Sequence, residues 1–92
     1  MLQQPDLRVT RWAAPVFDPE GHSALVLDLR TGTWLHLNEA AAAFLRQIAR
    51  GCGTRQAIAV LAEDFGVPAQ RLADDMAPLI ESLVRRRLLE RL

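Results

Sequence analysis

The sequence is poor in the side chains that most enzymes use for chemistry. Its 92 residues include one cysteine, two histidines and no tyrosine. Cys52 has no second cysteine to pair with, so no intramolecular disulfide can form. Neither His22 nor His36 has a partner at the spacing of metal ligands, and a single cysteine does not make a zinc site. We therefore expect no catalytic residues, no metal site and no cofactor.

The chain also lacks net charge and long apolar runs. Eleven acidic and eleven basic residues give a formal net charge of +0, whereas nonspecific nucleic-acid binding needs a basic surplus. No apolar run approaches the roughly 20 residues that span a bilayer. The first residues do not have the basic and apolar regions of a signal peptide. We expect a soluble, cytoplasmic protein that binds neither nucleic acid nor membrane.

The segment from Ser23 to Ala41 organises the rest of the chain. Residues 24–29 are rich in aliphatic side chains, as strands are, and the glycine within residues 30–32 suits a hairpin turn. Residues 33–37 alternate leucine with other side chains and predict a returning strand. Asn38 then stands where a helix N-cap is expected. The pattern predicts a hairpin that leads directly into a helix.

Three segments with helical spacing of hydrophobic residues follow the hairpin. They predict helices at about 39–50, at about 54–64 with Thr54 as its cap, and from Pro68 onward, with glycines ending the first two. Before the hairpin, residues 7–12 are a weak strand candidate, residues 13–22 predict a loop, and residues 1–6 predict a frayed terminus. This order predicts one α+β domain, residues 1–92, with a three-stranded antiparallel sheet followed by three helices in a winged helix-turn-helix-like arrangement.

The returning strand is the candidate binding element, because a small sheet leaves one edge open. An open edge can accept an extended peptide as an added strand, and the third helix would form the far wall of the groove. The candidate peptide-binding residues are Thr33, Trp34, Leu35, His36, Leu37, Asp75, Met76, Pro78 and Leu79. The alternative interpretation is that Trp34 covers the core and the edge binds nothing.

The corner between the second and third helices also permits a DNA-binding interpretation, with the third helix as recognition helix. Asp74 and Asp75 lie near the middle of that helix and would repel phosphates. The basic run Arg85–Arg87 lies at its C-terminal end, where cations suit the helix dipole. Peptide binding is therefore the favoured hypothesis, and a winged-helix DNA-binding or adaptor domain is the alternative.

An ordered set of residues between Leu25 and Leu89 resembles the PqqD-like family of peptide-binding domains, also called RiPP precursor recognition elements. The first half of the pattern is a Leu-Asp strand, a glycine turn, an aromatic strand ending in Leu-Asn, and a helix of small residues. The second half is an aromatic-Gly-Val link, an aspartate in the third helix and a closing Leu-Leu. The matching residues are Leu27, Asp28, Gly32, Trp34, Leu37, Asn38, Ala41, Phe65, Gly66, Val67, Asp75, Leu79, Leu83, Leu88 and Leu89. The chain departs from the pattern at Arg87, where the family usually has glycine.

The resemblance implies a non-catalytic protein that binds the leader segment of a ribosomally made precursor peptide. The leader would add as a strand to the returning strand and lie against the third helix. The chain looks most like the free-standing leader-binding proteins of lasso-peptide clusters. Their partners are a separately encoded transglutaminase-like cysteine protease and an ATP-dependent cyclase. The alternative within the family is a peptide chaperone for a radical S-adenosylmethionine enzyme in pyrroloquinoline quinone biosynthesis.

Overall fold

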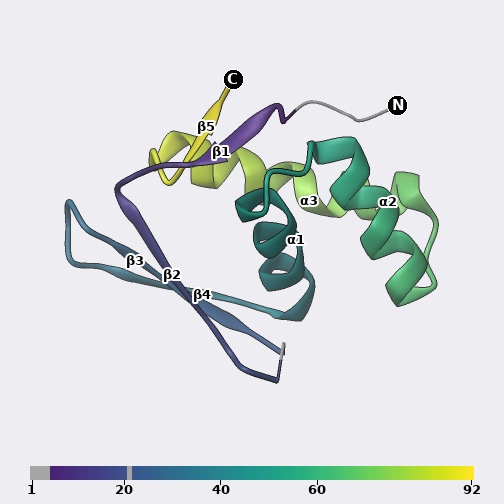
Figure 1. The fold of residues 1–92 in the computed structure, drawn as a ribbon, viewed down its shortest axis with the longest axis horizontal. Helices are drawn as coiled ribbons and strands as arrows, with labels where there is room; N and C mark the ends of the chain where they lie inside the picture. The colour runs from purple at the N-terminus through teal and green to yellow at the C-terminus, as the bar shows by residue number, and fades with distance from the viewer. Residues whose placement is uncertain (1–4, 21) are drawn as a thin grey trace.

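The computed structural model describes residues 5–20 and 22–92 and has two small sheets and three helices (Figure 1). A three-stranded antiparallel sheet lies on one side of the helices, and a two-stranded ribbon formed by the ends of the chain lies on the other. The elements in chain order are β1 (Leu7–Val9), β2 (Ala13–Phe17), β3 (Ala24–Asp28), β4 (Trp34–Leu37), α1 (Glu39–Ala49), α2 (Thr54–Phe65), α3 (Ala69–Arg85) and β5 (Leu89–Arg91). The expected α+β class is confirmed.

The hairpin of β3 and β4 forms as its sequence predicts. The Asp28 N–H donates to the Thr33 carbonyl (2.9 Å), and the Gly32 N–H donates to the Asp28 carbonyl (2.8 Å), so two residues of one arm face one residue of the other. This is a bulge with glycine in its left-handed position, and Gly32 has a φ of 74°. The Asp28 side chain accepts from the Arg30 N–H (2.9 Å) and stabilises the start of the turn.

The core lies between the three-stranded sheet and the helices. Val26 of β3 and Leu37 of β4 point inward and are buried, and α1 places Phe44 at the centre, where its side chain is 0% exposed. Leu61 of α2 and Leu83 of α3 close the cluster from the other helices. Full burial of each such side chain stabilises the fold by roughly 1.5–3 kcal/mol. Because these side chains come from both the hairpin and the helices, their packing holds the hairpin at a fixed angle to the helices.

The third strand of the main sheet comes from the segment that the sequence predicts to be a loop, so that prediction is wrong. β2 pairs with β3 along its whole length, from Ala13 opposite Asp28 to Phe17 opposite Ala24. The Leu29 N–H donates to the Trp12 carbonyl, so the backbone groups of Trp12 point toward β3. Backbone groups alternate in direction along an antiparallel pair, so those of Pro15, three residues later, point away from β3. A proline with no N–H to offer is acceptable at such an edge.

The weak strand candidate near the N-terminus pairs with the C-terminus of the chain instead of joining the main sheet. β1 and β5 are antiparallel, with Leu7 opposite Arg91 and Val9 opposite Leu89. Leu7 and Leu89 are both buried, so the ribbon packs its apolar side against the helices. The pairing of the two ends of the chain was not predicted from the sequence.

Local signals account for the start of α1 but not for the start of α2 or for the end of α3, where Arg87 has a φ of 60°. The Asn38 side chain caps α1 by accepting from the Ala41 N–H (2.9 Å), as predicted. Thr54 does not cap α2, because it is the first helical residue and Gly53 holds the N-cap position. The cap comes from Asp6, whose Oδ1 accepts from both the N–H (2.7 Å) and the hydroxyl (2.8 Å) of Thr54. Asp6 is therefore held in place, and residues 1–4 of the predicted frayed terminus lie outside the described residues.

Candidate functional site: the open edge of strand β4

Strand β4 is an edge strand, and no strand among the described residues pairs with its outer side. The Thr33 carbonyl points toward β3, where it accepts from the Asp28 N–H. Backbone groups alternate in direction along an antiparallel pair, so the N–H and C=O of Leu35 also point toward β3. Those of Trp34 and His36 point outward. Two residues of β4 therefore offer donors and acceptors to an incoming strand.

The side chains of β4 divide between the two faces of the sheet. Trp34 and His36 are exposed on the face away from the helices, and Trp34 keeps 53% of its surface exposed. Leu35 is half-buried on the helix side, while Leu37 is buried in the core. Trp34 thus does not cover the core. Leu37 contributes packing beneath the edge, and its side chain is not part of the accessible surface.

The opposite edge of the sheet is less suited to strand addition. Along β2 the outward-facing backbone positions include Pro15, which has no N–H to donate. A proline in such a position is one way in which proteins protect an edge strand from pairing. The outward positions of β4 carry no proline, so the two edges of this sheet differ in their capacity to accept a peptide.

The residues predicted on α3 occupy three different environments. Asp75 and Pro78 are exposed, Leu79 is half-buried, and Met76 is buried against the core. Met76 therefore lies beneath the surface and not on it. The helix runs on through Pro78. α1 is the helix that packs directly on β4, whereas α3 packs on α2 and β5. A groove with α3 as its far wall stays a prediction.

Apolar side chains continue across the outer face of the sheet, which the sequence analysis did not single out. Trp34 lies opposite Leu27 of β3, and Leu27 lies opposite Ala14 of β2, so they form one row. The adjacent row includes Leu25 and Val16, whose side chains are 41% and 57% exposed. The sequence does contain an indication of this apolar face: residues 24–27 are apolar at every position, so both faces of β3 are apolar.

No three His, Cys, Asp or Glu side chains of residues 5–20 and 22–92 are grouped so as to hold a metal ion. The Cys52 thiol contacts the side-chain oxygen of Gln47 (3.4 Å). Within the same residues, no helix is long and apolar enough to cross a membrane.

Comparison with known proteins shows a family match and a similar fold. Residues 23–89 match the family described as coenzyme PQQ synthesis protein D, PqqD. No curated protein matches the chain. Among solved structures, the fold is similar to that of TbiB1 in complex with the TbiA(beta) leader peptide, with a TM-score of 0.81 and 16% sequence identity. That similarity covers 90% of this chain and 94% of TbiB1.

Proposed function

The chain belongs to the PqqD family, and from this premise we propose that it binds the leader segment of a ribosomally synthesised precursor peptide. The observation that carries the proposal is the open edge of β4, with the backbone groups of Trp34 and His36 directed outward. The similar TbiB1 structure contains a leader peptide, which supports the same class of ligand for this chain. The proposed role is binding and presentation, with no chemistry performed by this protein.

Strand addition gives two different surfaces with which to recognise the leader. Leader residues that pair with Trp34 and His36 place their side chains on the outer face of the sheet, because paired residues share a face. Leader residues between them point toward the helix side, near Leu35. The exposed row that contains Trp34 and Leu27 favours an apolar or aromatic leader residue at the outer positions.

The third helix supplies the remaining part of the proposed site. Asp75 and Leu79 are four residues apart and share a helix face. In this proposal Leu79 provides an apolar contact and Asp75 a polar contact to the leader, with Pro78 at the exposed rim. Truncating a packed anchor such as Leu79 costs about 2 kcal/mol of binding, roughly thirtyfold in affinity.

The bound leader is then presented to a separately encoded enzyme. The partner we favour is a transglutaminase-like cysteine protease that removes the leader, with an ATP-dependent cyclase acting afterwards. A radical S-adenosylmethionine enzyme of pyrroloquinoline quinone biosynthesis is the second candidate, which the description of the matched family favours. Mixing the purified protein and precursor with each enzyme decides between them, since only the true partner turns over faster when this protein is present.

The edge itself is tested by placing proline at neighbouring positions of β4. His36→Pro removes one outward N–H and leaves the β3–β4 hydrogen bonds in place, so the fold is expected to persist. Leader affinity should fall about tenfold, because one backbone hydrogen bond is lost and the incoming strand is obstructed. The matched variant Leu35→Pro removes an inward N–H and should lower the melting temperature instead.

The measurement is a titration of each variant with a synthetic leader segment of its precursor peptide, with thermal melts in parallel. Asp75→Ala and Leu79→Ala test the α3 wall in the same assay, and Glu81→Ala, which removes an exposed side chain from a different face of the same helix, is the control. A His36→Pro protein that melts normally and binds the leader as tightly as the parent would overturn strand addition at β4. Tight duplex DNA binding without any leader binding would favour the winged-helix alternative.

A further inference from the structure

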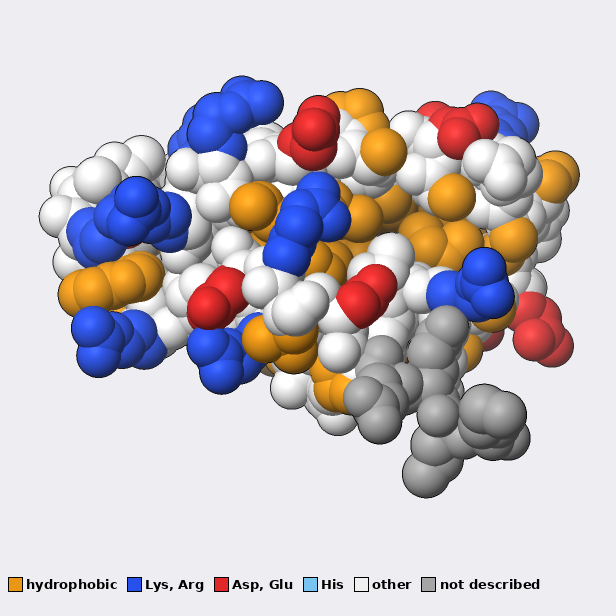
Figure 2. All heavy atoms as spheres, turned by 90° about the horizontal axis from the view of Figure 1, so that it is seen from above, with side chains coloured by type: hydrophobic (Ala, Val, Ile, Leu, Met, Phe, Trp, Pro, Cys, Tyr) orange, Lys and Arg blue, Asp and Glu red, His pale blue; other side chains and the backbone are white. Residues whose placement is uncertain are grey.

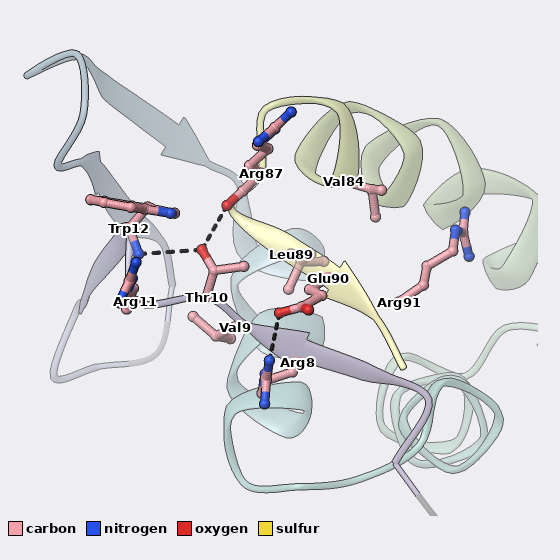
Figure 3. A pocket seen from close by; sticks show the side chains of 10 residues that line it. All are labelled: Arg8, Val9, Thr10, Arg11, Trp12, Val84, Arg87, Leu89, Glu90 and Arg91. Carbon is pink, nitrogen blue, oxygen red and sulfur yellow. Dashed lines mark hydrogen bonds and ion pairs between the residues drawn. The ribbon is translucent and has the colours of Figure 1, made fainter.

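A hollow of about 830 Å³ lies beside the β1–β5 ribbon, next to residues 10–12, which lead into β2 (Figure 3). Its lining contains none of the β4 or α3 residues assigned to leader binding. Arg8, Arg11, Arg87 and Arg91 line it, which is four of the eleven basic residues of a chain whose formal net charge is +0. Folding therefore brings together, around one hollow, arginine side chains from the two ends of the described chain.

These cations are largely uncompensated. The acidic residue that lines the hollow among the described residues, Glu90, is engaged by Arg8 at 2.6 Å. Arg11 lies over the Trp12 ring, 4.8 Å from its centroid, and is not paired with a carboxylate in the described residues. Arg87 and Arg91 likewise have no ion pair within that part of the chain. The hollow therefore carries a positive potential, while the charged residues outside it are acidic in balance.

Arg87 provides an independent indication that this hollow has a function. Its φ is 60°, and it is the residue other than glycine that adopts a positive φ among the described residues. An L-residue is disfavoured there, and the end of a helix normally uses glycine in this position. Backbone strain of this kind is retained most often where a side chain serves a site. The chain thus keeps a guanidinium at the hollow at a position where glycine would be the more stable choice.

The arrangement of the four guanidinium groups indicates the shape of the ligand. Figure 3 shows Arg11, Arg87, Arg91 and Arg8 on different sides of the hollow, and they do not converge on one point. Val9 and Val84, which are both half-buried, supply an apolar lining between them. Figure 2, which views this side of the molecule, shows basic side chains gathered over one half of the face with hydrophobic patches between them. One small anion would contact only part of such a site, whereas an extended segment with several carboxylates would contact all of it.

We propose that this basic hollow is a docking site for an acidic peptide segment of a partner protein other than the leader. Arginine pairs carboxylates through two parallel hydrogen bonds, which suits Arg87 and Arg91 to glutamate or aspartate side chains. The apolar lining contacts hydrophobic residues that alternate with the acidic ones. The site does not depend on leader binding at β4, so the protein could hold a leader and a second protein on separate surfaces.

The test uses the full chain and a labelled hexapeptide of alternating glutamate and leucine with blocked ends. The same peptide with lysine in place of glutamate is the control ligand. Arg87→Gly should weaken binding of the acidic peptide about fivefold, since one charge-assisted contact is lost. The same variant should melt at a higher temperature than the parent, because glycine relieves the positive φ. Arg71→Ala removes one positive charge from the exposed surface of α3 outside the hollow and should bind as the parent does.

Opposite changes in binding and stability are the expected signature of a residue retained for function. Equal affinity for the acidic and basic peptides, equal losses in Arg87→Gly and Arg71→Ala, or a lower melting temperature of Arg87→Gly would each overturn the proposal. So would stronger competition by inorganic phosphate or by a single-stranded oligonucleotide than by the unlabelled acidic peptide. Leader titrations of Arg87→Gly should match the parent, so failure at this site and failure at β4 are distinguishable.

Discussion

The cap that Asp6 places on helix α2 is the contact whose removal gives the clearest energetic prediction. Gly53 holds the N-cap position of α2 and has no side chain that could accept a hydrogen bond. The first N–H groups of that helix therefore need an acceptor from another part of the chain. Asp6 Oδ1 accepts from the Thr54 N–H at 2.7 Å and from its hydroxyl at 2.8 Å. The Asp6 carbonyl also accepts from the Leu92 N–H (3.0 Å), so the same residue joins both ends of the chain to α2.

The expected cost of Asp6→Ala follows from these contacts. Loss of an N-cap acceptor destabilises a protein by about 1 kcal/mol, and loss of a negative charge at a helix N-terminus adds about 0.5 kcal/mol. The sum is about 1.5 kcal/mol. For a domain of this size each kcal/mol lowers the melting temperature by roughly 4–8 °C, so Asp6→Ala should melt about 6–12 °C below the parent.

Calorimetry of three proteins separates the two contributions. Asp6→Asn keeps an oxygen that can accept from the Thr54 N–H and loses only the charge, so it should fall by about 0.5 kcal/mol. Asp6→Ala should lose the full amount. If all three proteins melt together, the long-range cap contributes nothing. If Asp6→Asn falls as far as Asp6→Ala, charge alone explains the effect and the hydrogen-bonding argument is wrong.

Three further changes probe the fold by other routes. Arg87→Gly should raise the free energy of unfolding by about 1 kcal/mol, because glycine adopts a positive φ without strain. Arg87→Ala should leave it near the parent value, because alanine is also disfavoured at a positive φ. Urea unfolding of the two variants measures both free energies. Phe44→Ala removes a side chain that is 0% exposed and should cost about 3–5 kcal/mol, which circular dichroism melts would report as severe destabilisation. Ala14→Pro should remove a hydrogen bond to β3 and destabilise the sheet by about 3 kcal/mol. Pro15→Ala should change stability by less than about 0.5 kcal/mol, because the backbone of residue 15 points away from β3. Similar melting temperatures of the two variants would contradict the assigned direction of the β2 backbone.

The sequence alone was sufficient for the elements that depend on neighbouring residues. The hairpin was predictable because Gly32 supplies the turn, and helix α1 was predictable because Asn38 accepts from the N–H of a residue three positions later. The left-handed glycines Gly51 and Gly66, with φ values of 93° and 65°, end α1 and α2 as predicted. In each case the physical cause and its effect lie within a few residues.

The strand at Ala13–Phe17 was missed for a reason that also affects the candidate site. Pro15 within it, Pro19 after it and its position between two turns predict a loop, and only pairing with β3 makes it a strand. The same pairing decides that Pro15 faces outward and leaves β4 as the edge with a full set of donors. The segment proposed to bind could thus be named from the sequence, but the direction of each backbone group within it depends on the register with β3.

The contacts that join distant parts of the chain were decided by the tertiary structure. β1 meets β5, and Asp6 reaches Thr54, because the helices fold the chain back on itself and not because of any local pattern. The basic hollow arises in the same way, since Arg11 and Arg87 are far apart in sequence and become neighbours only when the ribbon forms. A formal charge of +0 is a property of the sequence, whereas its division into a basic hollow and an acidic remainder is a property of the packing, because packing alone determines which charges share a surface.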